Sequence, residues 1–201
     1  QGTSKSVTYP MVRETFTALG THWNIVIDQE MTPDLARGLF HDVRERIELF
    51  EATYSRFRSG TLIDKIAHAA GSYTLPYDAQ KMFDMYEKLY AITGGMMTPL
   101  IGGTLVAAGY DKSYSLTPKE TVIAPVWEKR LTYAFPSLKV SEPTQLDLGA
   151  IGKGYCIDIV GEKPGLLPTP EWKKKAYKRP ADQVWFPGET VNLGLGQGYL
   201  L

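Results

Sequence analysis

The stretch LDLGAIGKGYCID, from Leu146 to Asp158, decides how the fold of this 201-residue chain is interpreted. Three of its residues are glycines, which let a backbone approach a ligand closely and direct amide N–H groups toward it: Gly149, Gly152 and Gly154. Lys153 adds a flexible positive charge that suits a phosphate oxygen. By pattern alone, a plain strand-to-helix turn with a solvated lysine is the more frequent explanation, so the residues leave both alternatives open.

A helix that begins in this stretch has a predictable buried face. Ile151, Tyr155 and Ile159 recur every four residues, so we expect them to face the core. Asp158 then shares a face with Gly154, where its carboxylate could accept hydrogen bonds from a ribose or a base. Cys156 lies in the same apolar context and is expected to be a core residue.

The residues before this stretch predict an α+β fold. In residues 14–28, ETFTALGTHWNIVID, apolar and polar residues alternate as in a strand, with Trp23, Ile25 and Ile27 on one face, and Gly20 permits a bend or bulge before it. A helix is expected over residues 32–54, with Thr32 as N-cap and Pro33 at the first helical position. Its apolar residues recur at helical spacing: Leu35, Leu39, Val43, Ile47 and Phe50.

A second helix is expected in residues 75–95, LPYDAQKMFDMYEKLYAITGG. Gly94 and Gly95 would end it. Its helical stripe is more typical of core than of a cofactor site: Met82, Met85, Tyr86, Leu89 and Tyr90. Short strands are predicted after it, around Leu105, Val122, Leu131 and Lys139.

Composition excludes several classes of function. Lys and Arg balance Asp and Glu at 22 each, so no overall charge favours nucleic acid as a partner. Cys156 is the single cysteine, which excludes an intramolecular disulfide. We find no apolar run long enough for a transmembrane segment. Residues 1–10 lack the apolar core of a signal peptide, so we expect any export signal to have been removed.

Two further stretches carry residues suited to nucleotide binding. In TYSRFRSGTLIDKI, residues 53–66, Tyr54 and Phe57 lie near Arg56 and Arg58, which suits stacking on a flat ring beside a phosphate. An ordinary helix end packed on the core explains them equally well. In TGGMMTPLIGG, residues 93–103, the hydroxyls of Thr93 and Thr98 could bind phosphate or ribose, as could that of Thr104 directly after it, although pattern alone favours a loop.

Taken in order, these stretches resemble the ApbE family, the FAD:protein FMN transferases that flavinylate exported bacterial proteins. The matching features are ALGTHWNIVID, FEATYSRFRSGTLIDKI, ITGGMMTPLIGGTL with the GY that follows it at Gly109 and Tyr110, and above all LDLGAIGKGYCID; together they span about Phe16 to Asp158. The chain departs from the family where Met96 and Met97 replace an aromatic and an acidic residue before Thr98.

The resemblance implies a flavin-transferase fold, FAD and Mg²⁺ as cofactors, and a bacterial periplasmic or other extracytoplasmic location. It implies transfer of FMN from FAD to a threonine or serine hydroxyl of an acceptor protein, with release of AMP. The implied cofactor-binding residues are Tyr54, Phe57, Arg58, Gly95, Thr98, Pro99, Gly149, Lys153 and Asp158. The carbonyl of Ala150 lies where the family's metal is bound. The family's metal-binding aspartate and threonine and its proposed catalytic histidine follow this motif, and nothing after Asp158 matches them, so no catalytic residue is assigned.

From Gly161 on, the chain becomes rich in proline and glycine, with too few apolar residues for a core of its own. Residues 161–201 resemble part of penicillin-binding protein 2, the elongation transpeptidase of cell-wall synthesis, between its second and third active-site motifs. We therefore predict an ApbE-like FAD-binding domain in residues 1–160, truncated and followed by a foreign tail that is not an independent domain.

Three functional hypotheses follow from this organisation. The first is an FMN transferase impaired by loss of its C-terminal half. The second is a non-catalytic FAD-binding module or chimeric scaffold. The third is a cell-wall-synthesis fragment without active-site motifs.

Overall fold

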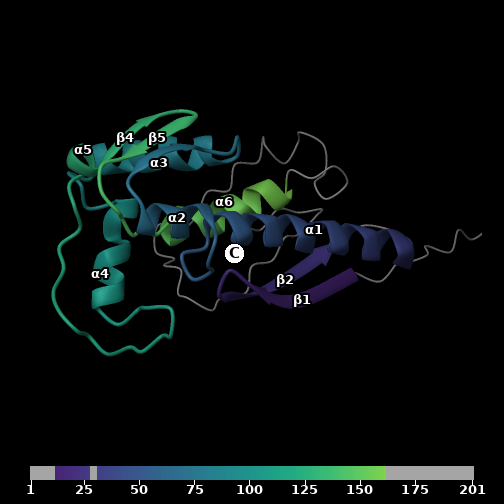
Figure 1. The fold of residues 1–201 in the computed structure, drawn as a ribbon. Coiled ribbons are helices and arrows are strands. Elements are labelled where there is room, and N and C mark those ends of the chain that lie inside the picture. The colour runs from purple at the N-terminus through teal and green to yellow at the C-terminus, as the bar shows by residue number, and fades with distance from the viewer. Residues whose placement is uncertain (1–11, 28–30, 162–201) are drawn as a thin grey trace, which may run out of the picture. The chain divides into compact units, whose positions relative to one another are not determined.

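The computed structural model describes residues 12–27 and 31–161 (Figure 1). Of these, the residues up to Leu49 and from Cys156 on form one compact unit, and Phe50–Tyr155 form a second. The division falls inside helices α1 (Pro33–Tyr54) and α6 (Gly149–Gly161), which each contribute to both units. The tail beyond Gly161 lies outside the described residues.

The first unit contains a β-hairpin, and its second strand is the one expected after Gly20. Strands β1 (Val12–Ala18) and β2 (Thr21–Ile27) pair antiparallel, with Ala18 opposite Thr21. The two residues between them have positive φ angles, 54° at Leu19 and 68° at Gly20, as tight hairpin turns require. The strand predicted after the bend at Gly20 is therefore confirmed as β2, whereas its pairing with β1 was not predicted. The predicted apolar face of the second strand is confirmed as buried.

Helix α1 begins as predicted, because the Leu35 amide donates a hydrogen bond to Thr32 Oγ1 at 3.3 Å. Its buried stripe differs in the first turns, where Leu35 is 55% exposed. The residues that are buried advance in alternating steps of four and three, which is the 3.6-residue period: Ala36, Phe40, Val43, Ile47, Phe50 and Tyr54. The predicted stripe began with three successive steps of four residues, from Leu35 to Ile47. Repeated steps of four exceed the 3.6-residue period, so the first predicted residues lie away from the buried face.

The second unit combines short helices with a three-stranded antiparallel sheet of order β3-β5-β4. Its elements, besides the ends of α1 and α6, are α2 (Leu62–His68), β3 (Gly71–Thr74), α3 (Ala79–Ile92), the 3-10 helix η1 (Pro99–Ile101), α4 (Gly102–Ala107), α5 (Trp127–Arg130), β4 (Leu131–Ala134) and β5 (Ser137–Val140). Its largest fully buried side chains include Phe83, Tyr86, Ile63 and Leu138.

The strands predicted around Leu131 and Lys139 are confirmed as β4 and β5. The other two strand predictions are wrong. Leu105 lies in α4, and Val122 lies in a segment without regular structure. Short apolar runs do not distinguish a strand from a short helix, which explains the error at α4.

Helix α6 starts at Gly149, as expected for a helix that begins within the glycine-rich stretch. Its most buried face, however, is formed by Gly152, Cys156 and Val160, each one residue after a residue of the predicted face. The predicted residues Ile151, Tyr155 and Ile159 are half-buried. A Cβ at Gly152 would lie 3.8 Å from the Phe50 ring, so the smallest residue faces an aromatic side chain. The prediction that Cys156 is a core residue is confirmed.

Candidate functional site

A buried ion pair joins two of the three stretches singled out in the sequence. Arg56 Nε lies 2.5 Å from Asp147 Oδ2, and the two side chains are only 3% and 14% exposed. The residues are 91 positions apart in the chain. Both side chains are largely shielded from water, so separating them would leave two buried charges without compensation. The pair therefore fixes the start of the glycine-rich stretch next to the residues that follow α1.

Asp147 also organises the beginning of α6. Its second carboxylate oxygen, Oδ1, accepts a hydrogen bond from the Gly149 amide at 2.7 Å. A Cβ on Gly149 would lie 2.9 Å from the same oxygen, so glycine permits this approach. A carboxylate at a helix N-terminus is stabilised by the free amides and the helix dipole.

The third stretch contacts the same point through its backbone. The Asp147 amide donates to the Pro99 carbonyl at 2.8 Å. A Cβ on Gly102 would lie only 2.4 Å from the Gln145 carbonyl oxygen, so only glycine allows this contact. Asp147 is therefore the residue at which all three stretches meet.

Tyr86 of α3 contacts Asp147 from the buried core. Its hydroxyl donates to the Asp147 carbonyl at 3.4 Å. Burial raises the pKa of the Tyr86 phenol above its ordinary value, and the nearby Asp147 charge acts in the same direction. The phenol thus remains a neutral donor at physiological pH.

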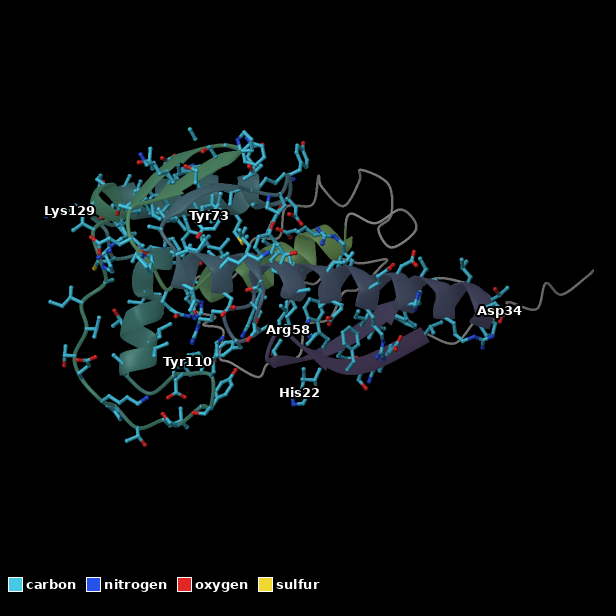
Figure 2. All side chains as sticks on the ribbon, viewed as in Figure 1. His22, Asp34, Arg58, Tyr73, Tyr110 and Lys129 are labelled. Atoms are coloured by element: carbon cyan, nitrogen blue, oxygen red, sulfur yellow. The ribbon has the colours of Figure 1, made fainter. Side chains whose placement is uncertain are left out.

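Aromatic rings cover the Arg56 guanidinium. Its central carbon lies 4.0 Å from the centroid of the Phe57 ring and 4.9 Å from that of Tyr110. Tyr114 stacks on Phe57 with centroids 5.2 Å apart. Nη1 and Nη2 of Arg56 are buried without a hydrogen-bond partner in the described part of the chain. Tyr110 and Tyr114 are 39% and 46% exposed, so the cluster presents aromatic surface outward (Tyr110 is labelled in Figure 2).

The loop that carries the two tyrosines is held by Asp111. Its carboxylate accepts hydrogen bonds from Ser113 and Ser115 and pairs with Lys119 at 3.3 Å. These hydrogen bonds, first of all that from the Ser115 amide, hold the pKa of Asp111 well below its usual range. The loop is therefore a structured support for the aromatic cluster.

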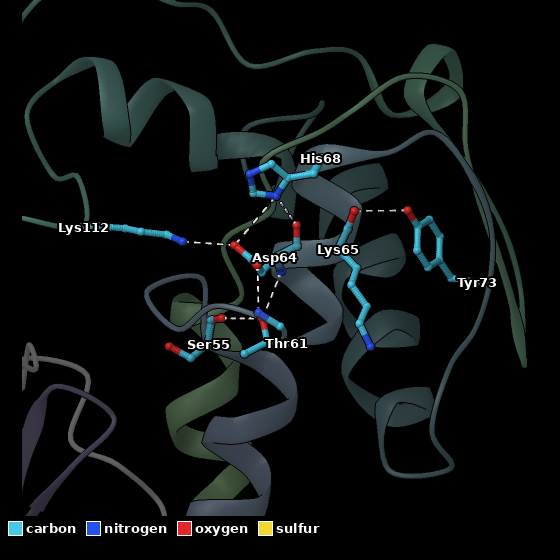
Figure 3. A network of polar contacts seen from close by, with 8 residues as sticks. Ser55, Thr61, Asp64, Lys65, His68, Tyr73 and Lys112 are labelled. Atoms are coloured by element: carbon cyan, nitrogen blue, oxygen red, sulfur yellow. Dashed lines mark hydrogen bonds and ion pairs between the residues drawn. The ribbon is translucent and has the colours of Figure 1, made fainter.

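A second polar network stabilises the start of α2 (Figure 3). Thr61 caps the helix by accepting from the Asp64 amide at 3.0 Å, and its hydroxyl donates to the Ser55 carbonyl at 2.8 Å. The Asp64 carboxylate accepts from the Gly60 amide at 2.8 Å and from Lys112 Nζ at 3.0 Å. The Gly60 hydrogen bond and then the Lys112 contact lower the pKa of Asp64.

The sequence-predicted residues near this cluster have different environments. Phe57 lies in the aromatic cluster, whereas Tyr54 is buried, with its hydroxyl bonded to Asp78. Arg58 is 39% exposed and its Nη2 lies 3.6 Å from Glu51 Oε2. Thr98 and Pro99 are buried, and Thr98 Oγ1 accepts from the Leu100 amide at 3.1 Å as the cap of η1.

The remaining predicted residues lie on α6 and beside α3. Lys153, Asp158 and Ala150 are exposed on α6, as is Gly154, where an added Cβ would meet nothing within 4 Å. Gly95 lies on the wall of a cleft formed by α3, α5 and β4.

The described residues fit the nucleotide part of a cofactor better than a metal. An exposed lysine on α6 and the outward aromatic surface at Phe57 offer charge and stacking. In contrast, residues 12–27 and 31–161 contain no group of three His, Cys, Asp or Glu side chains placed to hold a metal ion. The Ala150 carbonyl alone would supply one oxygen ligand, so these residues do not fit Mg²⁺ by themselves.

The sequence predicted no individual role for Asp147, Tyr110 or Tyr114. It placed Arg56 among residues suited to nucleotide binding, not in a buried ion pair. The one local signal for Asp147 was its position two residues before a glycine that opens a helix, which is typical of a capping carboxylate. The partnership with Arg56 has no local signal, because it depends on tertiary packing.

Comparisons with known proteins agree with this arrangement. A family model described as the ApbE family matches residues 19–163. Among solved structures, flavin transferase ApbE from Vibrio cholerae aligns with a TM-score of 0.61 at 17% identity, covering 76% of this chain and 52% of that one. The flavinyl transferase ApbE of Pseudomonas stutzeri aligns with a TM-score of 0.60 at 15% identity, covering 78% and 55%. Identities this low show a shared fold, and this chain spans about half the length of those proteins.

Curated relatives match a much shorter share of the chain. Peptidoglycan D,D-transpeptidase MrdA of Escherichia coli K12 is 43% identical over 54 residues, which is 26% of this chain and 8% of that protein. The Haemophilus influenzae MrdA is 49% identical over 43 residues, 21% of this chain and 6% of that protein. MrdA is penicillin-binding protein 2, so the predicted resemblance to that protein is confirmed as a short partial similarity. No helix in the described residues is both long and apolar enough to cross a membrane.

Proposed function

Because the family model covers well over half of its residues, this chain belongs to the ApbE family, and we propose that it is an FAD:protein FMN transferase. In the proposed reaction, a threonine or serine hydroxyl of an acceptor protein attacks the FMN phosphorus of FAD. The pyrophosphate bond breaks, AMP leaves, and the hydroxyl proton passes to a base that these residues do not identify. The family resemblance implies Mg²⁺ as the ion that would neutralise charge on the phosphates; of its ligands, the described residues would supply the Ala150 carbonyl. We also propose a bacterial extracytoplasmic location and acceptor.

The observation that carries the proposal is the Arg56–Asp147 pair. This pair joins the TYSRFRSGTLIDKI and LDLGAIGKGYCID stretches. The Asp147 amide also donates a hydrogen bond to the Pro99 carbonyl, which connects the stretch that contains Thr98 and Pro99. A nucleotide site needs its contacts held in a fixed arrangement, because phosphoryl transfer depends mainly on positioning and electrostatic stabilisation.

Within this proposal, each residue has a limited task. Lys153 binds a phosphate oxygen of the adenosine diphosphate part, and Asp158 accepts hydrogen bonds from the same part. Phe57 and Tyr54 line the nucleotide together with Arg58, and Gly95, Thr98 and Pro99 form the flavin loop. Gly149 lets the backbone approach the phosphates, and the Ala150 carbonyl contributes one metal ligand.

The same proposal includes impaired turnover. Each missing group that stabilises transition-state charge commonly costs about 10² or more in rate, and the described residues do not supply a metal site. We therefore propose slow transfer at most, with FAD binding as the better preserved property.

Release of AMP from FAD, with Mg²⁺ and a threonine-containing acceptor peptide, tests the transferase directly. We expect slow, Mg²⁺-dependent release that Lys153→Ala reduces further. A flat trace together with an FAD-induced rise in melting temperature would instead support the binding-module hypothesis. A flat trace with no such rise would refute both flavin hypotheses.

The short MrdA similarity favours one alternative, a fragment related to cell-wall synthesis. The motifs for acyl transfer are missing from the sequence, so a labelled β-lactam should not acylate this chain. Covalent labelling would contradict the proposal that the tail lacks the active-site motifs of that enzyme.

A further inference from the structure

A cleft of about 540 Å³ opens within the second unit, between α3, α5 and β4. Its walls come from α3 and the turn after it, from α5, and from the start of β4. The residues that matter for its chemistry are the aromatic side chains Tyr90, Trp127 and Tyr133 and the carboxylates Glu87 and Glu128. A cleft of this size can hold one side chain of a partner together with its neighbouring backbone.

Tyr90 holds the aromatic wall in place. The Tyr90 ring centroid lies 5.6 Å from that of Trp127. The Tyr90 hydroxyl accepts a hydrogen bond from the Trp127 backbone amide at 3.1 Å and donates one to Glu128 Oε2 at 3.5 Å. Gly95, with φ at 87°, packs against the Tyr90 ring, where an added Cβ would lie 3.3 Å away. Tyr133 is fixed from the other side by donating to Asp84 Oδ1 at 2.5 Å. The rings are therefore positioned before any ligand arrives.

The charge of this wall is negative. Glu87 and Glu128 are exposed, and no Lys, Arg or His is among the residues that line the cleft. Partial burial first, and then the Asp84 and Glu87 carboxylates, raise the pKa of the Tyr133 phenol. The nearest basic residues in sequence lie outside the lining: Lys88, Lys129, and Arg130, which pairs with Glu142. Aromatic faces next to carboxylates attract organic cations and repel phosphates.

We propose that this cleft binds a lysine or arginine side chain presented by a partner protein. The ammonium or guanidinium group would lie between the two carboxylates, and its aliphatic stem would contact the aromatic rings. The site shares only Gly95 with the proposed flavin-binding residues, so it does not depend on the FMN-transferase proposal.

The test uses the full chain and two capped peptides, acetyl-Gly-Lys-Gly-amide and its norleucine analogue, which lacks the charge. Binding is followed through the indole N–H signal of Trp127 in ¹⁵N NMR spectra, which Trp127→Phe identifies among the four tryptophans. We expect the lysine peptide to bind with a Kd on the order of 10 mM, and the norleucine peptide to bind at least about fivefold more weakly.

The charge requirement is tested with variants. The double change Glu87→Gln and Glu128→Gln should weaken binding at least about fivefold. Glu120→Gln, an exposed carboxylate outside the cleft, should leave it unchanged. Equal binding of both peptides, no shift of the indole signal, or an equal effect of the control variant would overturn the proposal.

A final arm separates this site from the flavin site. Saturating FAD should leave the Kd of the lysine peptide unchanged, whereas displacement of the peptide by FAD would refute a separate cation site. If FAD fails to bind while the peptide still binds, the transferase proposal fails and the cation site stands.

Discussion

Replacing Arg56 by methionine should destabilise this protein far more than the same change at Arg58. Methionine keeps an unbranched apolar side chain against the Phe57 and Tyr110 rings but removes the charge that faces Asp147. The Asp147 side chain is only 14% exposed, so the carboxylate would remain largely desolvated and unpaired. Breaking a buried pair in this way costs about 3–5 kcal/mol.

Arg58 provides the matched control. Its contact with Glu51 is longer, at 3.6 Å, and its side chain is 39% exposed. Solvent screens such a pair, so Arg58→Met should cost about 0–1 kcal/mol. The difference between the two variants measures the effect of burial on otherwise similar arginine–carboxylate contacts.

Urea unfolding followed by circular dichroism measures these costs as changes in the free energy of unfolding. Asp147→Asn retains an oxygen for the Gly149 amide but leaves the Arg56 charge unpaired, so it should be comparably destabilising. The double variant should cost less than the sum of the single changes, with a coupling of about 2 kcal/mol. Arg56→Lys, which keeps the charge, should recover part of the loss. Additive effects, or equal costs at Arg56 and Arg58, would refute the role given to this pair.

Two further predictions concern packing and pH. Gly102→Ala should cost about 1–3 kcal/mol of the free energy of unfolding, because its Cβ would lie 2.4 Å from the Gln145 carbonyl oxygen. Gly103→Ala has open space around its Cβ, so it should be neutral or stabilising by about 1 kcal/mol. Urea unfolding of both variants measures these changes, and equal costs would contradict the prediction. The pKa of Asp64 is lowered in the folded state, first by the hydrogen bond from the Gly60 amide. The ionised carboxylate therefore stabilises the fold at pH values above its unfolded pKa, and this stabilisation is lost as the pH falls through its folded pKa. Asp64→Asn should therefore be destabilising at pH 7, and its difference from the parent protein should shrink below about pH 4; a constant difference from pH 7 to pH 3 would contradict this.

The parts of the fold predicted from the sequence are those set by local patterns. The burial of Trp23 and its strand neighbours, the Thr32 cap, and the glycine end of α3 each follow from residues close together in the chain. Errors of one residue at Leu35 and at Ile151 arose because several adjacent apolar residues could each start the buried stripe. In such segments, tertiary packing chooses among them.

The candidate site was predictable only as separate stretches. Glycines, a lysine and aromatics beside arginines were visible in the sequence, and the family resemblance joined them into one hypothesis. The Arg56–Asp147 contact, 91 residues apart, required the fold. The contacts of Tyr110 and Tyr114 with Phe57 were also not predicted, because they join residues more than 50 positions apart and Tyr114 has an uncommon positive φ of 50°.

Equilibrium binding of FAD to the full chain, measured by flavin fluorescence anisotropy, tests the central proposal most directly. We expect saturable binding that ADP competes with and that Lys153→Ala weakens about tenfold, since a charge-assisted contact to phosphate is lost. Lys139→Ala, an exposed lysine on β5, should leave the affinity unchanged. The absence of saturable binding, or equal effects of the two lysine variants, would contradict the proposal that this chain retains the nucleotide-binding part of an FMN transferase.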